Sequence, residues 1–558
     1  MLCLRKNLIL GGIILAALLP WASARADVVG ESQNFFVNRT FDSSQRAILS
    51  ASLEIVGQHA YYYVDQKYLD ALGPAAKASM LQELNSLSNE FDSNIYPKET
   101  AFWGSEANPG VDNDPRITIL LESLKSGTGG YFDSVNGYLK SQVTGSNQRE
   151  MLVLNSDALG RGDLNAFLAH EMQHLISFNQ KELTSHVSEE TWLNELRSQY
   201  AITIAGYDEP FVGSDLQERA LTFLNDPTDS LTEWPNTDQD YASVTLFGQY
   251  LVGHFGPAIL TDTLHSSLVG IDSINDWLAT HGHSERFGDL FADWELANYR
   301  NDTSVDPLWG YTQPALSGLK VRSSEVRFLN FPTSASYQFS LKPWQPEWYQ
   351  FAVSNSVPSE QGLQISWTSP NIAMLYYDNL GRVQEIANPS VIGKSSELKW
   401  FVLMPVNSSK LSDFSANDPS TAFSLNLSFT AALAGSSDLA ISPVVHDGSL
   451  IKHASAPDIY VVEGGYKRRL DPAVLPMYGF DASTAVTVPE SVFESYKTSN
   501  YIRPVDGKQV YAVWPDGTKH WLNMSAATFN DSGRDWNSIF IVNDLENNFY
   551  KTGSDIRR

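Results

Sequence analysis

Up to about residue 155 the chain alternates short apolar runs with stretches of helical spacing. The runs HAYYYVD (59–65), RITILLE (116–122) and EMLVLN (150–155) are short and rich in β-branched or aromatic residues, which predicts strands. Between the first two, AAKASMLQELNSLSNEFD has apolar residues three and four positions apart, which predicts a helix. The sequence therefore predicts a mixed α/β segment that ends in a strand.

From about residue 183 to residue 300 the apolar residues mostly recur at helical spacing. Each helical stretch ends near Gly, Asn or a polar run, as helices commonly do. The stretches are WLNELRSQYAITIAG, DYASVTLFGQYLVGHFG and FGDLFADWELANY. A strand-rich first region thus leads into a helix-rich second region.

After Trp309 the pattern changes to short alternating runs such as WYQFAVS, LQISWTS and LKWFVLMPV, separated by Pro, Ser, Asn and Gly. Strands at this spacing, with no helical pattern between them, are typical of an antiparallel β-sandwich. We place this all-β domain at residues 313–432. A linker rich in Ser, Ala and Gly follows at residues 433–456.

Residues 457–558 repeat internally. Two pairs of stretches are similar and lie at nearly constant spacing along the chain. They are DIYVVEGGYKRRLDP with QVYAVWPDGTKHWLNM, and FESYKTSNYIRP with FYKTGSDIRR. Such a period indicates two copies of one small β-rich unit. We expect these modules to bind or space something, such as an extracellular or cell-surface ligand, rather than to catalyse.

Length and composition fit this division into several domains. A chain of 558 residues is too long for one hydrophobic core. Hydrophobic residues make up 42% of the chain and charged residues 18%, which is the balance of an ordered protein.

The first 26 residues resemble a cleavable signal peptide. Arg5 and Lys6 precede the apolar run LILGGIILAALL, and PWASARAD offers small-residue cleavage sites that end at Ala24 or Ala26. The run is too short for a good membrane span. We therefore expect an exported bacterial protein, extracellular or periplasmic, with no transmembrane anchor after cleavage.

The cysteine content bears on disulfide bonds, and the net charge bears on which binding partners the chain can have. The only cysteine, Cys3, lies inside the predicted signal peptide, so the mature chain would have no disulfide. Removing residues 1–26 takes away three cations and changes the formal charge from −26 to −29. Nucleic acids and anionic membrane surfaces would repel such a chain.

The stretch LNAFLAHEMQHLISFNQK (164–181) follows Asp163, a candidate N-cap, and carries two histidines four positions apart. At about 100° per residue, His170 and His174 lie on one edge of an apolar stripe, and Glu171 falls within it. The stripe consists of Leu164, Phe167, Leu168, Met172 and Leu175. The alternative is that the two histidines are incidental surface residues. That alternative does not explain an acid within the apolar stripe, where burying a carboxylate without a partner or a function costs free energy.

This spacing suits zinc hydrolysis. Two imidazoles at i and i+4 can bind one Zn²⁺, and the Glu between them can take a proton from the bound water. A catalytic zinc usually has a third protein ligand. Glu195, in EETWLNELRSQYA, follows His174 on what the pattern predicts to be a second helix, beside the apolar Trp192 and Leu193.

HEMQH followed by WLNE resembles the gluzincin class of zinc metallopeptidases. More narrowly, these two motifs together with VDNDPRITILL, EMLVLN and FADWELANY are similar to the hyicolysin-like family of bacterial neutral metallopeptidases, over roughly residues 50–300. The resemblance implies an α+β fold in which a zincin-like domain, with a mixed sheet and a helical subdomain, occupies residues 27–312. It also implies that His170, His174 and Glu195 bind one zinc ion and that Glu171 is the general base.

The chain departs from the family pattern just after Glu195. Such enzymes commonly read Asn-Glu-Gly-x-Ser-Glu-Tyr, whereas this chain reads NELRSQY, so Leu196 replaces a glycine and Gln199 replaces an acid. A carboxylate there would accept a hydrogen bond from a ligand histidine and raise its basicity. Gln199 accepts without charge, so weaker zinc binding or slower turnover is expected.

Two further residues are candidates for stabilising the oxyanion. Gluzincins often use a Tyr or His from this later region, which makes Tyr241 the first candidate and His254 the second. A Tyr near a helix start is more often a packing residue. Calcium binding by Asp112 and Asp114 in VDNDP lacks the full spacing of a calcium loop, so this stretch is expected to be a turn.

We therefore expect a secreted zinc endopeptidase that acts on proteins or peptides, with strand 150–155 pairing with an extended substrate. The alternative is a zincin-fold protein with impaired catalysis that serves as an extracellular binding or adhesion module. An aminopeptidase is disfavoured, because the chain lacks a Gly-x-Met-Glu-Asn motif.

Overall fold

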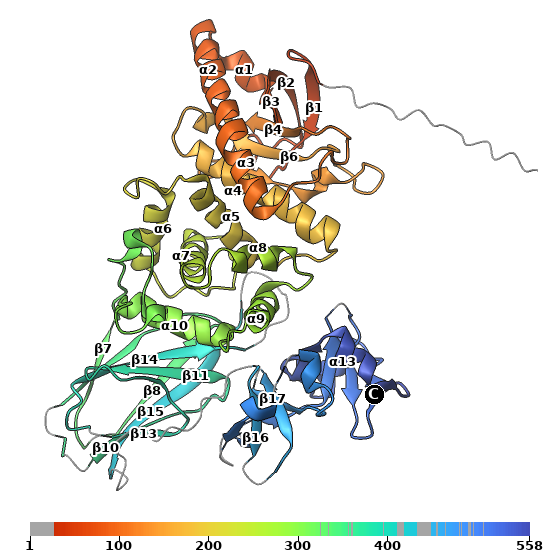
Figure 1. The fold of residues 1–558 in the computed structure, drawn as a ribbon. Helices are drawn as coiled ribbons and strands as arrows, with labels where there is room; N and C mark the ends of the chain where they lie inside the picture. The colour runs from red at the N-terminus through yellow and green to blue at the C-terminus, as the bar shows by residue number, and fades with distance from the viewer. Residues whose placement is uncertain are drawn as a thin grey trace, which may run out of the picture. The chain divides into compact units, whose positions relative to one another are not determined.

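The computed structural model describes residues 27–557 except positions 324, 333, 355–356, 359–360, 394, 410–417, 432–447, 454–455, 464, 479, 481, 489–492, 495 and 506. The predicted signal peptide with Cys3, and most of the predicted linker, lie outside the described residues. Helices and strands occupy largely separate stretches, so the α+β class is confirmed (Figure 1). Within the described part, no helix has the length and apolar character needed to cross a membrane.

The chain forms two compact units, Met1–Asp92 with Ala107–Leu159 and Ser93–Glu106 with Gly160–Arg558. Both contribute to the region predicted as one peptidase domain at 27–312. The predicted domain boundaries stay a prediction.

The first unit is built on a six-stranded sheet with the order β1-β2-β3-β4-β6-β5. Its strands are β1 (Ser32–Phe36), β2 (Ile48–Val56), β3 (Ala60–Asp65), β4 (Ile117–Glu122), β5 (Gly130–Phe132) and β6 (Met151–Asn155). The three strands predicted from sequence, β3, β4 and β6, run parallel and are fully buried. Burial on both faces explains their near-continuous apolar sequences.

The first two strands belong to the same core. Phe35 of β1 and Leu49 and Leu53 of β2 pack with residues of β3 and β4. Two helices of this unit, α1 (Gln66–Ala71) and α2 (Pro74–Glu90), follow β3. The segment from β1 to β2 is thus part of the sheet.

Strand β6 is an inner strand, so the expectation that it pairs with substrate is wrong. It pairs with β4 on one side, Thr118 opposite Met151, and with β5 on the other, Tyr131 opposite Val153. Its backbone hydrogen-bonding groups therefore face neighbouring strands on both edges.

The second unit begins with helices. They are α3 (Tyr96–Trp103), α4 (Leu164–Ser177), α5 (Thr191–Ala205), α6 (Asp215–Asn225), α7 (Asp238–Phe255), α8 (Ala258–His265), α9 (Gly270–Thr280) and α10 (Phe287–Arg300). Helix α4 packs against α5, and α5 packs against α7. This trio carries the motifs that the sequence singled out.

Two sheets follow, with orders β13-β10-β15-β8 and β12-β11-β14-β9-β7, and they share one hydrophobic core as a sandwich does. The strands are β7 (Val326–Leu329), β8 (Ala335–Leu341), β9 (Tyr349–Val353), β10 (Gln361–Trp367), β11 (Ile372–Asp378), β12 (Val383–Glu385), β13 (Ser390–Ile392), β14 (Trp400–Asn407) and β15 (Thr421–Ala431). All pairs are antiparallel except β7 with β9, which is parallel.

The last two sheets have matching strand orders, β19-β16-β17-β18-β20 and β24-β21-β22-β23-β25. The first contains β16 (Leu450–His453), β17 (Ile459–Glu463), β18 (Tyr466–Arg469), β19 (Val486–Val488) and β20 (Lys497–Thr498). The second contains β21 (Tyr501–Pro504), β22 (Tyr511–Val513), β23 (Thr518–Trp521), β24 (Ile539–Val542) and β25 (Lys551–Thr552), with helices α12 (Ala526–Asp531) and α13 (Asp544–Phe549). Equivalent strands of the two sheets are separated by the same spacing as the internal repeat of the sequence.

Candidate metal centre

Helix α4 is buried over most of its surface. The buried residues include the apolar stripe except Phe167, and also His170, Glu171 and Gln173. Asp163 precedes the first helical residue, as predicted, but its side chain makes no capping hydrogen bond. The helix continues directly into a π-helical turn, η4 (Phe178–Thr184), and π-helical turns occur frequently at functional sites.

The side chains of His170, His174 and Glu195 converge on one point. The two imidazole Nε2 atoms lie 3.1 Å apart. Glu195 Oε2 lies 3.2 Å from Nε2 of His170 and 3.4 Å from Nε2 of His174. Among the described residues, this is the one group of three such side chains close enough to hold a metal ion.

These spacings fit a zinc ion. Bonds of about 2.0–2.1 Å in tetrahedral geometry place neighbouring ligand atoms about 3.3 Å apart. Glu195 Oε2 is also buried and accepts no hydrogen bond of good geometry, although two imidazoles face it. A cation between the three atoms would satisfy it.

Electrostatics within the cluster favour a shared positive charge. Burial lowers the pKa of His174, but the charge and hydrogen bond of Glu195 outweigh it and raise that pKa to about 9. Burial raises the pKa of Glu195, and the two imidazoles more than reverse this, so it lies well below its usual range. Without metal the cluster therefore holds a proton near neutral pH, which a metal ion must displace.

Glu171 is 6% exposed and lies close enough for its charge to act on the cluster. It contributes to the raised pKa of His174 and to that of Tyr241. A buried carboxylate beside the three converging ligand atoms is what the general-base prediction requires.

The two candidates for oxyanion stabilisation lie in different places. The ring centroid of Tyr241 is 6.2 Å from that of His170, and burial followed by the charges of Glu195 and Glu171 raises its pKa. Its hydroxyl donates to Asn236 Oδ1 at 3.1 Å. His254 lies more than three turns farther along α7, about 20 Å along the axis. It contacts the Gly310 carbonyl and the Tyr250 ring, so its candidacy is wrong.

Leu196, which replaces a family glycine, points into the core and is fully buried. On α7 it faces Gly248, where an added Cβ would lie 3.1 Å from the Leu196 side chain. A large residue on α5 is thus matched by a small one on α7. The substitution is accommodated by packing between α5 and α7.

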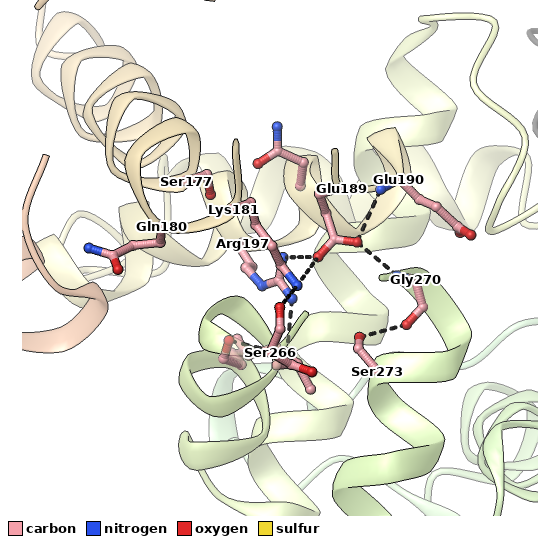
Figure 2. A network of polar contacts seen from close by, with 12 residues as sticks. Ser177, Gln180, Lys181, Glu189, Glu190, Arg197, Ser266, Gly270 and Ser273 are labelled. Carbon is pink, nitrogen blue, oxygen red and sulfur yellow. Dashed lines mark hydrogen bonds and ion pairs between the residues drawn. The ribbon is translucent and has the colours of Figure 1, made fainter. Parts of the chain in front are cut away.

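A buried charged network lies on another side of α5 (Figure 2). Arg197 pairs with Glu189 at 2.6 Å and donates to Thr263 on α8. Lys181 lies 3.4 Å from the same carboxylate and donates to the Ser266 and Leu268 carbonyls. The side chains of Lys181, Glu189 and Arg197 are 1%, 4% and 0% exposed, so solvent scarcely screens these charges.

The network also reaches the start of α9. Glu189 accepts from the backbone N–H of Gly270 at 2.7 Å, where the helix N-terminus favours a negative charge. Gly270 has a φ of +52°, and an added Cβ would lie 2.2 Å from the Glu190 carboxylate. The contacts therefore join η4, α5, α8 and α9, and they fix the helix that carries Glu195.

Sequence reasoning did not identify the groups that contact the far side of the imidazoles. Ser198 Oγ lies 3.0 Å from His174 Nδ1, and Thr245 Oγ1 lies 3.3 Å from Gln199 Oε1. Only Gln199, 3.4 Å from His170 Nδ1, was anticipated. Ser198 shares the polar side of α5 with Glu195, which was the available signal.

The calcium candidates form a turn. Asp112 Oδ1 accepts from the backbone N–H of Asp114, whose own carboxylate accepts from Arg116 N–H and the Tyr61 hydroxyl. These side-chain oxygens serve local hydrogen bonds, as expected of an Asx turn.

No protein-family model matches the chain. Among curated proteins it is similar to the neutral metalloprotease ShpI of Staphylococcus hyicus, with 26% identity over 240 residues that cover 38% of this chain and 49% of that protein. The chain thus spans about half the length of the curated relative it matches. This likeness supports a resemblance to metalloproteases, and the narrower hyicolysin-like assignment stays a prediction.

The similar solved structures do not bear on the resemblance to metalloproteases. The chain matches PliG, a periplasmic lysozyme inhibitor of g-type lysozyme from Salmonella Typhimurium, at 10% identity and a TM-score of 0.15, over 19% of this chain and 100% of that one. A PliG mutant from Escherichia coli gives 9% identity and a TM-score of 0.14, with the same coverage. Likeness at this level carries no argument about fold.

Proposed function

We propose that the protein is an exported zinc endopeptidase with a zincin-like catalytic domain. The observation that carries the proposal is the convergence of His170, His174 and Glu195 at the spacing of zinc ligands, with the buried Glu171 beside them. The metalloprotease likeness, the acidic composition and the predicted signal peptide support it.

The chain's own residues divide the work of peptide hydrolysis. Bound zinc would polarise the scissile carbonyl and acidify a water molecule. Glu171 takes a proton from the attacking water while the oxygen of that water bonds to the carbonyl carbon. As the C–N bond breaks, Glu171 returns that proton to the leaving amine. Tyr241, the nearby hydroxyl donor, stabilises the oxyanion after leaving Asn236.

The test is cleavage of an unfolded protein such as casein by the purified chain. We expect hydrolysis that a chelator abolishes and zinc restores, and Glu171→Gln should reduce it by about 10²–10⁴-fold while zinc still binds. Glu83→Gln, an exposed acid on α2, is the matched control and should leave activity unchanged. Hydrolysis that survives Glu171→Gln at the original rate would contradict the mechanism.

An alternative is a zincin-fold binding protein that has lost turnover. Gln199 favours it, because an uncharged amide replaces the acid of the family pattern beside His170. Leu196 does not, since Gly248 accommodates it. One zinc ion per chain with no cleavage of a broad peptide library would establish this alternative. The C-terminal repeats would bind an extracellular or cell-surface ligand under either proposal.

A further inference from the structure

Each imidazole of the cluster presents Nε2 to Glu195, and its Nδ1 contacts a residue of the next turn of α5. A histidine that binds metal through Nε2 carries its proton on Nδ1 and needs an acceptor there. For His174 the acceptor is Ser198 Oγ at 3.0 Å. The Ser198 hydroxyl donates onward to Gln173 Oε1 at 2.6 Å, and Gln173 Nε2 donates to Ser177 Oγ.

For His170 the partner is Gln199, whose Nε2 lies 3.4 Å from Nδ1. In that orientation two N–H groups would face each other once Nε2 binds a cation. Thr245 meets a second conflict, because its one hydroxyl proton faces both Gln199 Oε1 at 3.3 Å and the Tyr241 carbonyl at 2.7 Å.

Turning the Gln199 amide over, so that its oxygen and nitrogen exchange places, removes both conflicts. The nitrogen and oxygen of an amide have nearly the same shape, so hydrogen-bond logic decides between them. With Oε1 toward His170, the amide accepts from Nδ1–H. Its Nε2 then donates to Thr245 Oγ1, and Thr245 donates to the Tyr241 carbonyl. Each contact from His170 Nδ1 through Gln199 and Thr245 to the Tyr241 carbonyl then joins one donor to one acceptor.

We infer that Ser198 and Gln199 are positioning residues that hold both imidazoles ready for metal with uncharged partners, and that Thr245 sets the direction of Gln199. This rests on the proposed zinc site. Gln199 and Ser198 are 4% and 0% exposed, so water does not compete for these contacts. The contacts that run from His170 through Gln199 to Thr245 form an uncharged relay. This relay takes the place of the carboxylate of the family pattern in orienting His170.

The absence of a charge in this relay suits the charge balance of the site. Glu195 and Glu171 together match the charge of one divalent cation, and a third buried carboxylate would leave an excess negative charge. That excess is costly without zinc, but in the zinc-bound site the added carboxylate attracts the cation and accepts a hydrogen bond from His170 Nδ1–H. Gln199→Glu should therefore bind zinc at least as tightly as wild type. Gln199→Leu removes the acceptor and should weaken zinc binding about 10–100-fold.

Helices α5 and α7 offer a matched control one turn farther on. Gln249 Nε2 donates to Thr203 Oγ1 at 2.8 Å, so this pair joins the same two helices by the same kind of contact without touching an imidazole. Gln249→Leu loses a comparable hydrogen bond and should leave zinc affinity unchanged. Thr245→Val should fall between wild type and Gln199→Leu.

The experiment is zinc affinity of the full chain, measured by competition with a chelating dye, for wild type and these four variants. The expected order is Gln199→Glu at least equal to wild type, then Thr245→Val, then Gln199→Leu, with Gln249→Leu at the wild-type value. Equal weakening by Gln199→Leu and Gln249→Leu, or none by Gln199→Leu, would overturn the positioning role. A wild-type chain that binds no zinc would instead overturn the proposed function, and the relay with it.

Discussion

Helix α5 meets two very different polar surroundings within three residues. Arg197 lies in the buried charged network with Glu189 and Lys181 (Figure 2). The next two residues, Ser198 and Gln199, reach the imidazoles of α4 through hydroxyl and amide groups alone. Both regions are shielded from solvent, so the difference lies in charge and not in burial.

The difference shows what each region is suited to do. Buried charges are costly unless they pair, and pairing Glu189 with two cations holds together segments that are far apart in sequence. Beside a metal site, an added charge would change the balance that the ligands and Glu171 already supply. Charge therefore holds the helices in place, and uncharged groups orient the ligands. Substitutions in the charged network should therefore affect stability, and substitutions beside the imidazoles should affect metal affinity.

The largest expected effect is on stability. Glu189→Gln leaves Lys181 and Arg197 buried without their anion, and breaking a buried pair typically costs about 3–5 kcal/mol. Hydrogen exchange of α5 amides should speed up accordingly in the zinc-free chain. Zinc affinity of the folded molecule should change little, because no imidazole loses its partner.

Glu83→Gln is the control for this substitution as well, since that acid is exposed on α2. It should leave exchange at wild-type rates. A Glu189→Gln chain that is as stable as wild type, or that mainly loses zinc, would remove the distinction between the two surroundings.

The next effect is on metal affinity. Ser198→Ala deprives His174 Nδ1 of its acceptor, so zinc should bind about 10–100-fold more weakly, while stability falls by only about 1 kcal/mol. A chelator competition and a hydrogen-exchange measurement on the same sample give both values. Glu189→Gln should thus mainly lower stability, whereas Ser198→Ala should mainly lower zinc affinity.

Ser273→Ala is matched to Ser198→Ala, because Ser273 is a buried helical serine whose hydroxyl donates to the Gly270 carbonyl. It should lower stability by a similar amount and leave zinc affinity unchanged. Equal zinc affinities for the two alanine variants would mean that Ser198 does not position His174.

The smallest effect is in the response to acid. Burial raises the pKa of Glu189, but Arg197 and Lys181 outweigh it and hold that pKa below its ordinary value of 4.5. A lowered carboxyl pKa adds stability above about pH 4.5, and this is lost as pH falls through the native pKa. The stability of Glu189→Gln should therefore decline less steeply than wild type below pH 4.5.

Lys181 gives the corresponding alkaline behaviour. Burial lowers its pKa to about 8, with the charge of Glu189 opposing this shift and that of Arg197 adding to it. A lowered lysine pKa means that the native state releases its proton first, so this group favours folding increasingly between about pH 8 and its ordinary 10.5. Lys181→Met should lack this rise in stability. A rise of equal size in both chains would exclude Lys181 as its source.

Local pattern was enough to predict much of the fold. Strands β3, β4 and β6 and helices α2, α5, α7 and α10 lie where apolar spacing placed them. Helix α6 was overlooked although its signals were present, since Ser214 caps it and Leu216, Ala220 and Phe223 recur at helical spacing on its buried face. Strand β1 is only five residues long and begins with Ser, Gln and Asn, which hid it. Strand β2 was overlooked although six of its nine residues are apolar.

Contacts distant in sequence were beyond prediction. Spacing alone placed His170 and His174 on one side of a helix and suggested Glu195. It could not show that β6 has neighbours on both edges, or that α7 carries Tyr241 toward the cluster and His254 away from it. Such facts depend on how elements pack.

The most direct test of the central claim is diffraction from zinc-containing crystals at the zinc absorption edge. We predict one strong anomalous peak about 2.0–2.2 Å from Nε2 of His170, Nε2 of His174 and the Glu195 carboxylate. No peak at that position, or a zinc ion held by other residues instead, would contradict the account.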